Sequence, residues 1–139
     1  MVARFTNGGV ARALEFDIGR FRSQREVQLT NIRKALVSMD RPALVRVSEQ
    51  MNDAKNKDLY EQNLEILESL VRDIWLTKND SDRSIVNKDI AEDLNKIAPS
   101  VSTEKLAATL SEIELLRQSF FVNINRKAAT DGLFMKMSA

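Results

Sequence analysis

Residues 104–122 read Glu104-Lys-Leu-Ala-Ala-Thr-Leu-Ser-Glu-Ile-Glu-Leu-Leu-Arg-Gln-Ser-Phe-Phe-Val122, and this run decides the fold of the chain. Its apolar side chains, continued by Ile124, recur every three or four residues, at Leu106, Leu110, Ile113, Leu116, Phe120 and Ile124. This spacing predicts a long amphipathic helix with one buried apolar stripe. The pattern breaks at Asn123-Ile-Asn125 and restarts over residues 126–135, where the side chain of Asn125 is expected to cap the next helix. Two helices are therefore expected to meet at this point.

The widest apolar surface is predicted for a helix from about Asp58 to Lys78. Two neighbouring stripes run along it, one formed by Leu59, Ile66, Leu70 and Ile74 and the other by Tyr60, Leu64, Leu67, Val71 and Trp75. A stripe of that width is contacted from more than one side, so this helix is expected at the centre of the fold. Trp75 is interpreted as a core or groove residue rather than a base-stacking platform.

Helix boundaries can be predicted from capping residues. The pair Gly8-Gly9 is expected to form a turn before a short helix over residues 10–16, and a second helix is expected from about Arg20 to near Met39. Asp40, followed closely by a proline, is typical of the start of another short helix. Asn87 is expected to cap a short helix that Pro99 ends, and Ser102 to cap the long helix.

The composition excludes many kinds of chemistry. The chain has no His and no Cys, which excludes disulfides, imidazole bases and thiol nucleophiles and argues against zinc. Only 4 Gly and 2 Pro among 139 residues leave little turn chemistry for a sheet, so we expect an all-α fold, a compact helical bundle. The loop from Asn79 to Ser84 lacks the glycine and the terminal Glu of a calcium loop, and Gly8-Gly9 lacks the Lys-Ser/Thr of a phosphate loop. We expect no catalytic residue, no cofactor and no metal.

Charge is nearly balanced overall but not locally. The formal net charge is +1, whereas residues 1–34 carry seven cations against three anions, a net charge of +4. Such an excess is typical of a solvated face or a subunit contact, with nucleic-acid binding as an alternative. Arg20, Arg22 and Arg25 are the candidate interface residues in this segment. No apolar run reaches membrane-spanning length and no secretory signal is present, so a cytoplasmic protein without membrane contact is expected.

Three segments resemble one family. They are Arg4-Phe-Thr-Asn-Gly8-Gly9-Val-Ala-Arg12-Ala13-Leu14, then Leu70-Val-Arg72-Asp73-Ile-Trp75-Leu-Thr-Lys78, and last Asn123-Ile-Asn125-Arg-Lys-Ala-Ala-Thr-Asp131-Gly-Leu133. Together they are similar to the C-terminal part of the bacterial DNA polymerase III clamp-loader delta-prime subunit. Arg126 and Asp131 depart from the proline and glutamate that are common in the family, and Gly132 lies inside the predicted last helix.

The resemblance implies a scaffold. Residues 1–18 would be the end of an AAA+ lid domain, and residues 19–139 a helical collar domain that holds the clamp loader together during DNA replication. Ala11 stands where ATP-binding relatives place a lid arginine, which implies a subunit that does not hydrolyse ATP. The implied partners are the gamma/tau and delta subunits and, indirectly, the sliding clamp and primer-template DNA. Trp75, Asn123 and Asn125 join the arginines as candidate structural or interface residues.

Several alternatives remain open from the sequence. The chain is expected to be a monomer or a weak oligomer when isolated, and Met1 is expected to begin a truncated chain or an unusual short gene, because the nucleotide-binding domain is missing. A gamma/tau-type collar, a free-standing helical adaptor and a helical nucleic-acid-binding domain are the rival functions. An enzyme is the most distant one, since Glu112 and Glu114, two apart on a helix, point to different sides.

Overall fold

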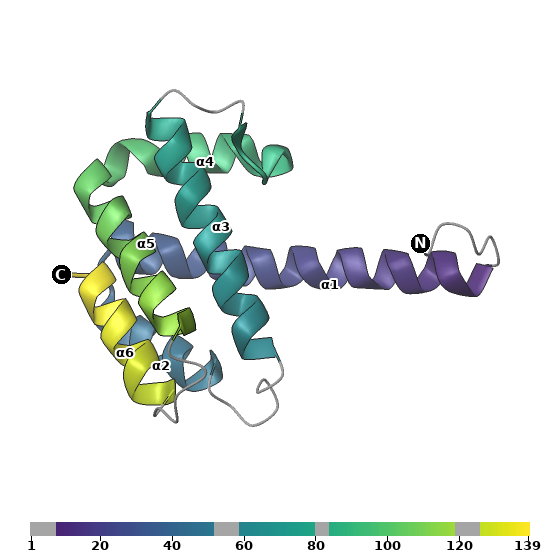
Figure 1. Ribbon diagram of the computed structural model, residues 1–139, viewed down its shortest axis with the longest axis horizontal. Helices are drawn as coiled ribbons and strands as arrows, with labels where there is room; N and C mark the ends of the chain where they lie inside the picture. The colour runs from purple at the N-terminus through teal and green to yellow at the C-terminus, as the bar shows by residue number, and fades with distance from the viewer. Residues whose placement is uncertain (1–7, 52–58, 80–83, 119–125) are drawn as a thin grey trace.

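The fold consists of helices throughout the part of the chain that the structure describes. The computed structural model describes residues 8–51, 59–79, 84–118 and 126–139, with side chains from residue 18 onward in the first range and from residue 128 in the last. Its α-helices are α1 (Gly8–Ile32), α2 (Arg41–Met51), α3 (Tyr60–Lys78), α4 (Ala91–Ile97), α5 (Thr103–Gln118) and α6 (Arg126–Met137), joined in part by the short helices η2 (Arg33–Val37), η5 (Lys88–Ile90) and η6 (Ala98–Ser100) (Figure 1). These ranges contain no strand, and the predicted all-α bundle is confirmed.

Helix α1 is longer than the sequence predicted. Instead of a short helix and a second one from about Arg20, a single helix runs from Gly8 to Ile32. The predicted break was wrong because no proline lies between the two patterns, and one helical glycine, Gly19, costs only about 1 kcal/mol relative to alanine. The first half of α1 projects away from the bundle, and its second half packs against α3 (Figure 1). The boundary predicted after residue 18 falls inside this helix, and the division into domains stays a prediction.

The end of α1 reverses the chain direction. The helix widens into η2, a π-helix in which the N–H of Ser38 donates to the carbonyl of Arg33 at 2.9 Å. Met39 follows with a φ of 52°, in the left-handed region that ends many helices. The predicted end of this helix near Met39 is therefore confirmed, and α2 starts in a new direction.

Two predicted helix caps are present. The carboxylate of Asp40 accepts the N–H of Ala43 at 3.2 Å at the start of α2. The hydroxyl of Ser102 accepts the N–H of Lys105 at 3.1 Å at the start of α5. Each satisfies one of the N–H groups that the first turn of a helix leaves without a partner inside the helix.

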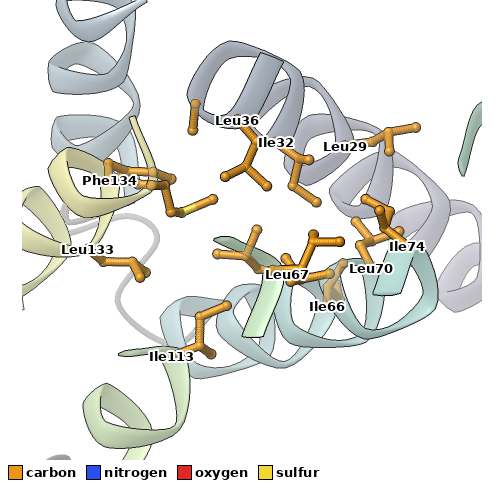
Figure 2. Packing of buried hydrophobic residues seen from close by; sticks show 14 of the residues in the cluster. Leu29, Ile32, Leu36, Ile66, Leu67, Leu70, Ile74, Ile113, Leu133 and Phe134 are labelled. Atoms are coloured by element: carbon orange, nitrogen blue, oxygen red, sulfur yellow. The ribbon is translucent and has the colours of Figure 1, made fainter. Parts of the chain in front are cut away.

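Helix α3 lies at the centre, as predicted, and packs against α1, α4 and α5. Figure 2 shows Leu67 and Leu70 of α3 beneath the apolar side chains at the end of α1. The buried residues of α3 are Tyr60, Leu64, Ile66, Leu67, Leu70, Val71, Asp73 and Ile74. Since each large apolar side chain contributes about 1.5–3 kcal/mol on burial, this helix provides much of the stability of the bundle.

The C-terminal helices close the bundle. Helix α6 packs on α2 and α5, and its Phe134 is 1% exposed. The hydroxyl groups of Tyr60 and Thr130 are hydrogen-bonded, which ties α6 to the start of α3. Of the stripe predicted on the long helix, Leu106, Ile113 and Leu116 are buried; Phe120 and Ile124 lie outside the described residues. Within the described ranges, none of the helices has the length and apolar character to span a membrane.

Candidate subunit interface

The three candidate arginines lie on α1, but their surroundings differ. Arg20 and Arg22 are exposed on the part of the helix that precedes its contact with the bundle, next to the exposed apolar side chains of Ile18 and Phe21. Arg25 is one turn further on and only 8% exposed. Arg20 and Arg22 are therefore accessible to a partner, whereas Arg25 has a structural role.

Arg25 joins α1 to the segment before α4. Its guanidinium donates two hydrogen bonds to the carboxylate of Asp89, at 2.9 and 2.5 Å, and lies 5.4 Å from the ring centre of Phe21. A weaker bond of 3.4 Å runs from the same group to the side-chain carbonyl of Asn87. The two-pronged arginine–carboxylate contact fixes both distance and orientation. It sets the position of α1 relative to η5.

The Arg25 contact also shifts the acidity of its partner. The hydrogen bond from Arg25 lowers the pKa of the Asp89 carboxyl below 3.8; the Coulomb attraction of Arg25 and Arg22 and a backbone hydrogen bond act in the same direction, and desolvation partly opposes them. The Asp89 side chain is 51% exposed, so water screens the pair and limits its effect on stability.

A buried polar network extends this joint into α3. Asp73 is 0% exposed, and its carboxylate accepts the backbone N–H groups of Val86 and Asn87, at 3.1 and 2.8 Å. The side-chain amide of Asn87 donates to Asp73 at 2.7 Å and to the hydroxyl of Ser69 at 3.3 Å. Asn87 was predicted to cap a helix, and although it stands at the N-cap position of η5 its side chain makes no cap hydrogen bond. That prediction was wrong because the side-chain oxygen, which would have to accept the N–H of a cap, faces the Arg25 guanidinium instead, while the amide is held by Asp73.

Trp75 lines a groove between α3 and α5. The groove has a volume of about 440 Å³ and is lined by Glu68, Arg72 and Trp75 from α3 and by Ala107, Leu110, Ser111 and Glu114 from α5. Trp75 and Leu110 are partly buried and pack on the core, so they form an apolar floor between charged sides. The prediction that Trp75 is a core or groove residue agrees with this position. The other lining residues were not singled out from the sequence.

Most cations beside this groove already have partners. Arg117 donates to Glu68 at 2.8 Å and to Glu65 at 3.4 Å, across the α3–α5 contact. Lys78 donates to the carbonyl of Ala98 at 3.1 Å. Arg72, by contrast, is exposed at the groove. In the rows of α3 and α5 that line the groove, where residues recur every three or four positions, the acidic residues outnumber the basic ones: Glu61, Glu65, Glu68, Glu104 and Glu114 against Arg72, Lys78 and Arg117.

The two carboxylates weighed as an acid–base pair lie on different sides of α5. Glu112 forms an ion pair with Lys136 of α6 at 3.1 Å. Glu114 lines the α3–α5 groove and accepts a hydrogen bond from Gln118 at 3.2 Å. The expectation that they diverge is confirmed, and the pair has no shared site. Over the described ranges, no three acidic side chains cluster closely enough to hold a metal ion.

Two candidate residues and one loop are not covered by these observations. Asn123 and Asn125, predicted to separate the last two helices, lie outside the described residues. The helices on either side of them, α5 and α6, are present as predicted. Residues 80–83 of the loop that was weighed as a calcium site also lie outside the described ranges.

Comparison with known protein families gives a match over most of the chain. Residues 20–129 match the family described as DNA polymerase III, delta subunit, C terminal. The chain belongs to this family. The match begins at Arg20 on α1 and ends within α6, so it includes the α3–α5 groove and the Arg25 network. No curated protein and no solved structure showed a significant match.

Membership in this family confirms the resemblance to a clamp-loader subunit, but it does not confirm that the subunit is delta-prime. The chain is a domain of a clamp-loader subunit of DNA polymerase III, with a role in clamp loading. The family description gives the delta subunit, whereas the sequence resembled delta-prime. The delta-prime assignment therefore stays a prediction.

Proposed function

We propose that this DNA polymerase III domain is a non-catalytic scaffold of the delta-prime type, which holds neighbouring clamp-loader subunits together while the sliding clamp is loaded. The match of residues 20–129 to the C-terminal family is the observation that carries the proposal. The gamma/tau and delta subunits are the proposed partners, and the site of action is the replication machinery in the cytoplasm.

The use of charged residues within the bundle supports a scaffold. Arg25 and Arg117 both form ion pairs that link one helix or helical segment to another, with Asp89 and with Glu68. The carboxylate of Asp73 is buried and accepts hydrogen bonds from two backbone N–H groups. Side chains that tie helices together in this way favour a rigid body with protein-facing surfaces.

The delta-prime assignment rests on the sequence resemblance. Ala11 stands at the position where ATP-binding members of the clamp-loader family place an arginine, which favours a subunit that does not hydrolyse ATP. A gamma/tau-type collar is the alternative within the same assembly. Competition for one place in the complex separates the two, because a delta-prime domain displaces full-length delta-prime and leaves gamma/tau bound.

The assembly experiment uses size exclusion of the chain mixed with full-length gamma/tau and delta subunits of the same organism. We expect co-elution, displacement of full-length delta-prime, and loss of clamp loading by the resulting complex, since the collar supplies position and the catalytic modules lie elsewhere. Elution of the chain alone in every mixture would refute the proposal.

Nucleic-acid binding is the competing result of that experiment. Arg25 is paired with Asp89, and Arg33 lies 3.4 Å from Asp93, so both cations are partly committed inside the domain. Among the arginines of α1 whose side chains the structure describes, Arg20 and Arg22 are exposed and available for phosphate contacts. Binding to primer-template DNA with a steep dependence on salt, without subunit binding, would favour a nucleic-acid-binding domain.

A further inference from the structure

We propose that the groove between α3 and α5 receives a cationic amphipathic helix from a neighbouring clamp-loader subunit. This inference rests on the proposed assembly function and adds the surface and the chemistry of the partner. Three features of the groove lead to it: the apolar floor, the excess of carboxylates beside it, and the shape formed by two packed helices.

The floor provides the apolar contact. Trp75 of α3 and Leu110 of α5 form this floor and pack against the core beneath it. A partner side chain that enters the groove would cover apolar surface that the domain itself leaves open. Aromatic residues in such positions contribute large contact areas at interfaces.

The dimensions fit two turns of a helix. The α3 wall runs from Glu68 to Trp75 and the α5 wall from Ala107 to Glu114, and seven residues of helix span about 10 Å. The short side chains of Ala107 and Ser111 keep the α5 wall low, so a third helix can approach. Helix-in-groove recognition uses anchors spaced three and four apart, which is the spacing that two turns provide.

The sign of the charge selects a cationic partner. Glu114 is exposed at the groove and has Gln118, a neutral group, as its described partner. Glu61 and Glu104 add exposed carboxylates at the starts of α3 and α5. The cations Arg117 and Lys78 are already bonded within the domain, so Arg72 is the exposed cation that stands against these three carboxylates. Opposite charges on a partner helix would be attracted to this surface, whereas an acidic helix would be repelled.

The single tryptophan makes the groove directly observable. Trp75 is the only Trp in the chain, so 5-fluorotryptophan labelling gives one ¹⁹F resonance that originates in the groove. The labelled chain is titrated with unlabelled full-length gamma/tau and delta subunits. We expect the resonance to shift when the subunit that occupies the groove binds.

Charge reversal with a matched control tests the role of the groove. Glu114→Lys is expected to weaken binding of that subunit about tenfold, because it places a cation against the cationic helix. Glu49→Lys makes the same change on an exposed position of α2, outside the groove, and is expected to change affinity by less than about twofold. Thermal melts of both variants show whether the fold is retained.

The outcomes separate this inference from the assembly role. If the subunits bind without a ¹⁹F shift, and both variants bind equally well, the groove proposal is overturned while the assembly role stands. If no subunit binds, the assembly role is refuted, and the groove proposal that rests on it is refuted as well. A ¹⁹F shift that follows the concentration of the chain alone would identify a second copy as the occupant and would also overturn the proposal.

Discussion

Replacement of Asp73 by alanine tests the buried network that joins α3 to the segment before α4. The carboxylate accepts hydrogen bonds from the N–H of Val86, the N–H of Asn87 and the side-chain amide of Asn87, at 3.1, 2.8 and 2.7 Å. Alanine removes the acceptor and leaves all three donors in place. The cost is therefore set by how many of these donors can turn to water or to another acceptor.

The magnitude follows from the burial of each donor. Val86 is 70% exposed, so its N–H can regain a water molecule, whereas Asn87 is 3% exposed. The amide of Asn87 keeps its bond to Ser69 at 3.3 Å, so one backbone donor loses its partner fully and one side-chain donor loses it partly. An unsatisfied buried donor costs about 1–3 kcal/mol, and we expect Asp73→Ala to lower the free energy of unfolding by about 3 kcal/mol. For a domain of this size, this corresponds to a melting temperature lower by about 10 °C.

Urea denaturation followed by circular dichroism measures the change, with Asp93→Ala as the control. Asp93 forms an ion pair with Arg33 at 3.4 Å, and both side chains are 41% exposed. Removal of such a pair is expected to cost less than about 0.5 kcal/mol. Equal unfolding free energies for the two variants, at equal dependence on urea, would refute the assignment of a stabilising role to the buried carboxylate.

Three further predictions concern the core, the Arg25 contact and nucleotide binding. Leu70→Asp is expected to unfold the domain or strongly lower its melting temperature, because Leu70 is 0% exposed and an unpaired charge would be buried; an unchanged melting curve would remove α3 from the centre of the fold. The stability difference between the parent chain and Asp89→Asn is expected above pH 3.8 and should decline as the pH falls below 3.8 through the lowered pKa of Asp89; a difference that stays constant over that fall in urea titrations would contradict a charged pair. Calorimetric titration with magnesium–ATP is expected to show no binding, since the chain has no phosphate-loop motif, and saturable micromolar binding would count against the scaffold.

The elements governed by local sequence were predictable. The caps at Asp40 and Ser102 follow from hydrogen bonds that span three residues, and a sequence pattern contains both partners. The central position of α3 followed from the width of its stripe, because a helix that buries most of its circumference needs neighbours on several sides. The broader family assignment was also accessible, through short segments that span most of the chain.

The features governed by distant partners were not predictable. Arg25 and Asp89 are 64 residues apart, and no local pattern distinguishes Arg25 from the exposed Arg22. Asn87 has the residue type and position of a cap, but its side chain is drawn to a carboxylate 14 residues earlier on α3. The groove residues likewise come from two helices, and its acidic surroundings become visible only when α3 and α5 lie side by side. The delta-prime assignment still rests on the sequence resemblance, since the description of the matched family gives the delta subunit.

The continuity of α1 has a mechanical consequence. Its later part is held by the Arg25–Asp89 contact and by the buried Leu29 and Ile32. The part from Gly8 to Arg25 extends from the bundle as an unbroken helix (Figure 1). The helix rises by about 25 Å between Gly8 and Arg25, so a tilt of about 10° at the Arg25–Asp89 contact moves the far end by about 4 Å. A groove contact that rotates the bundle by a small angle would thus be amplified into a displacement of whatever the tip of the helix touches.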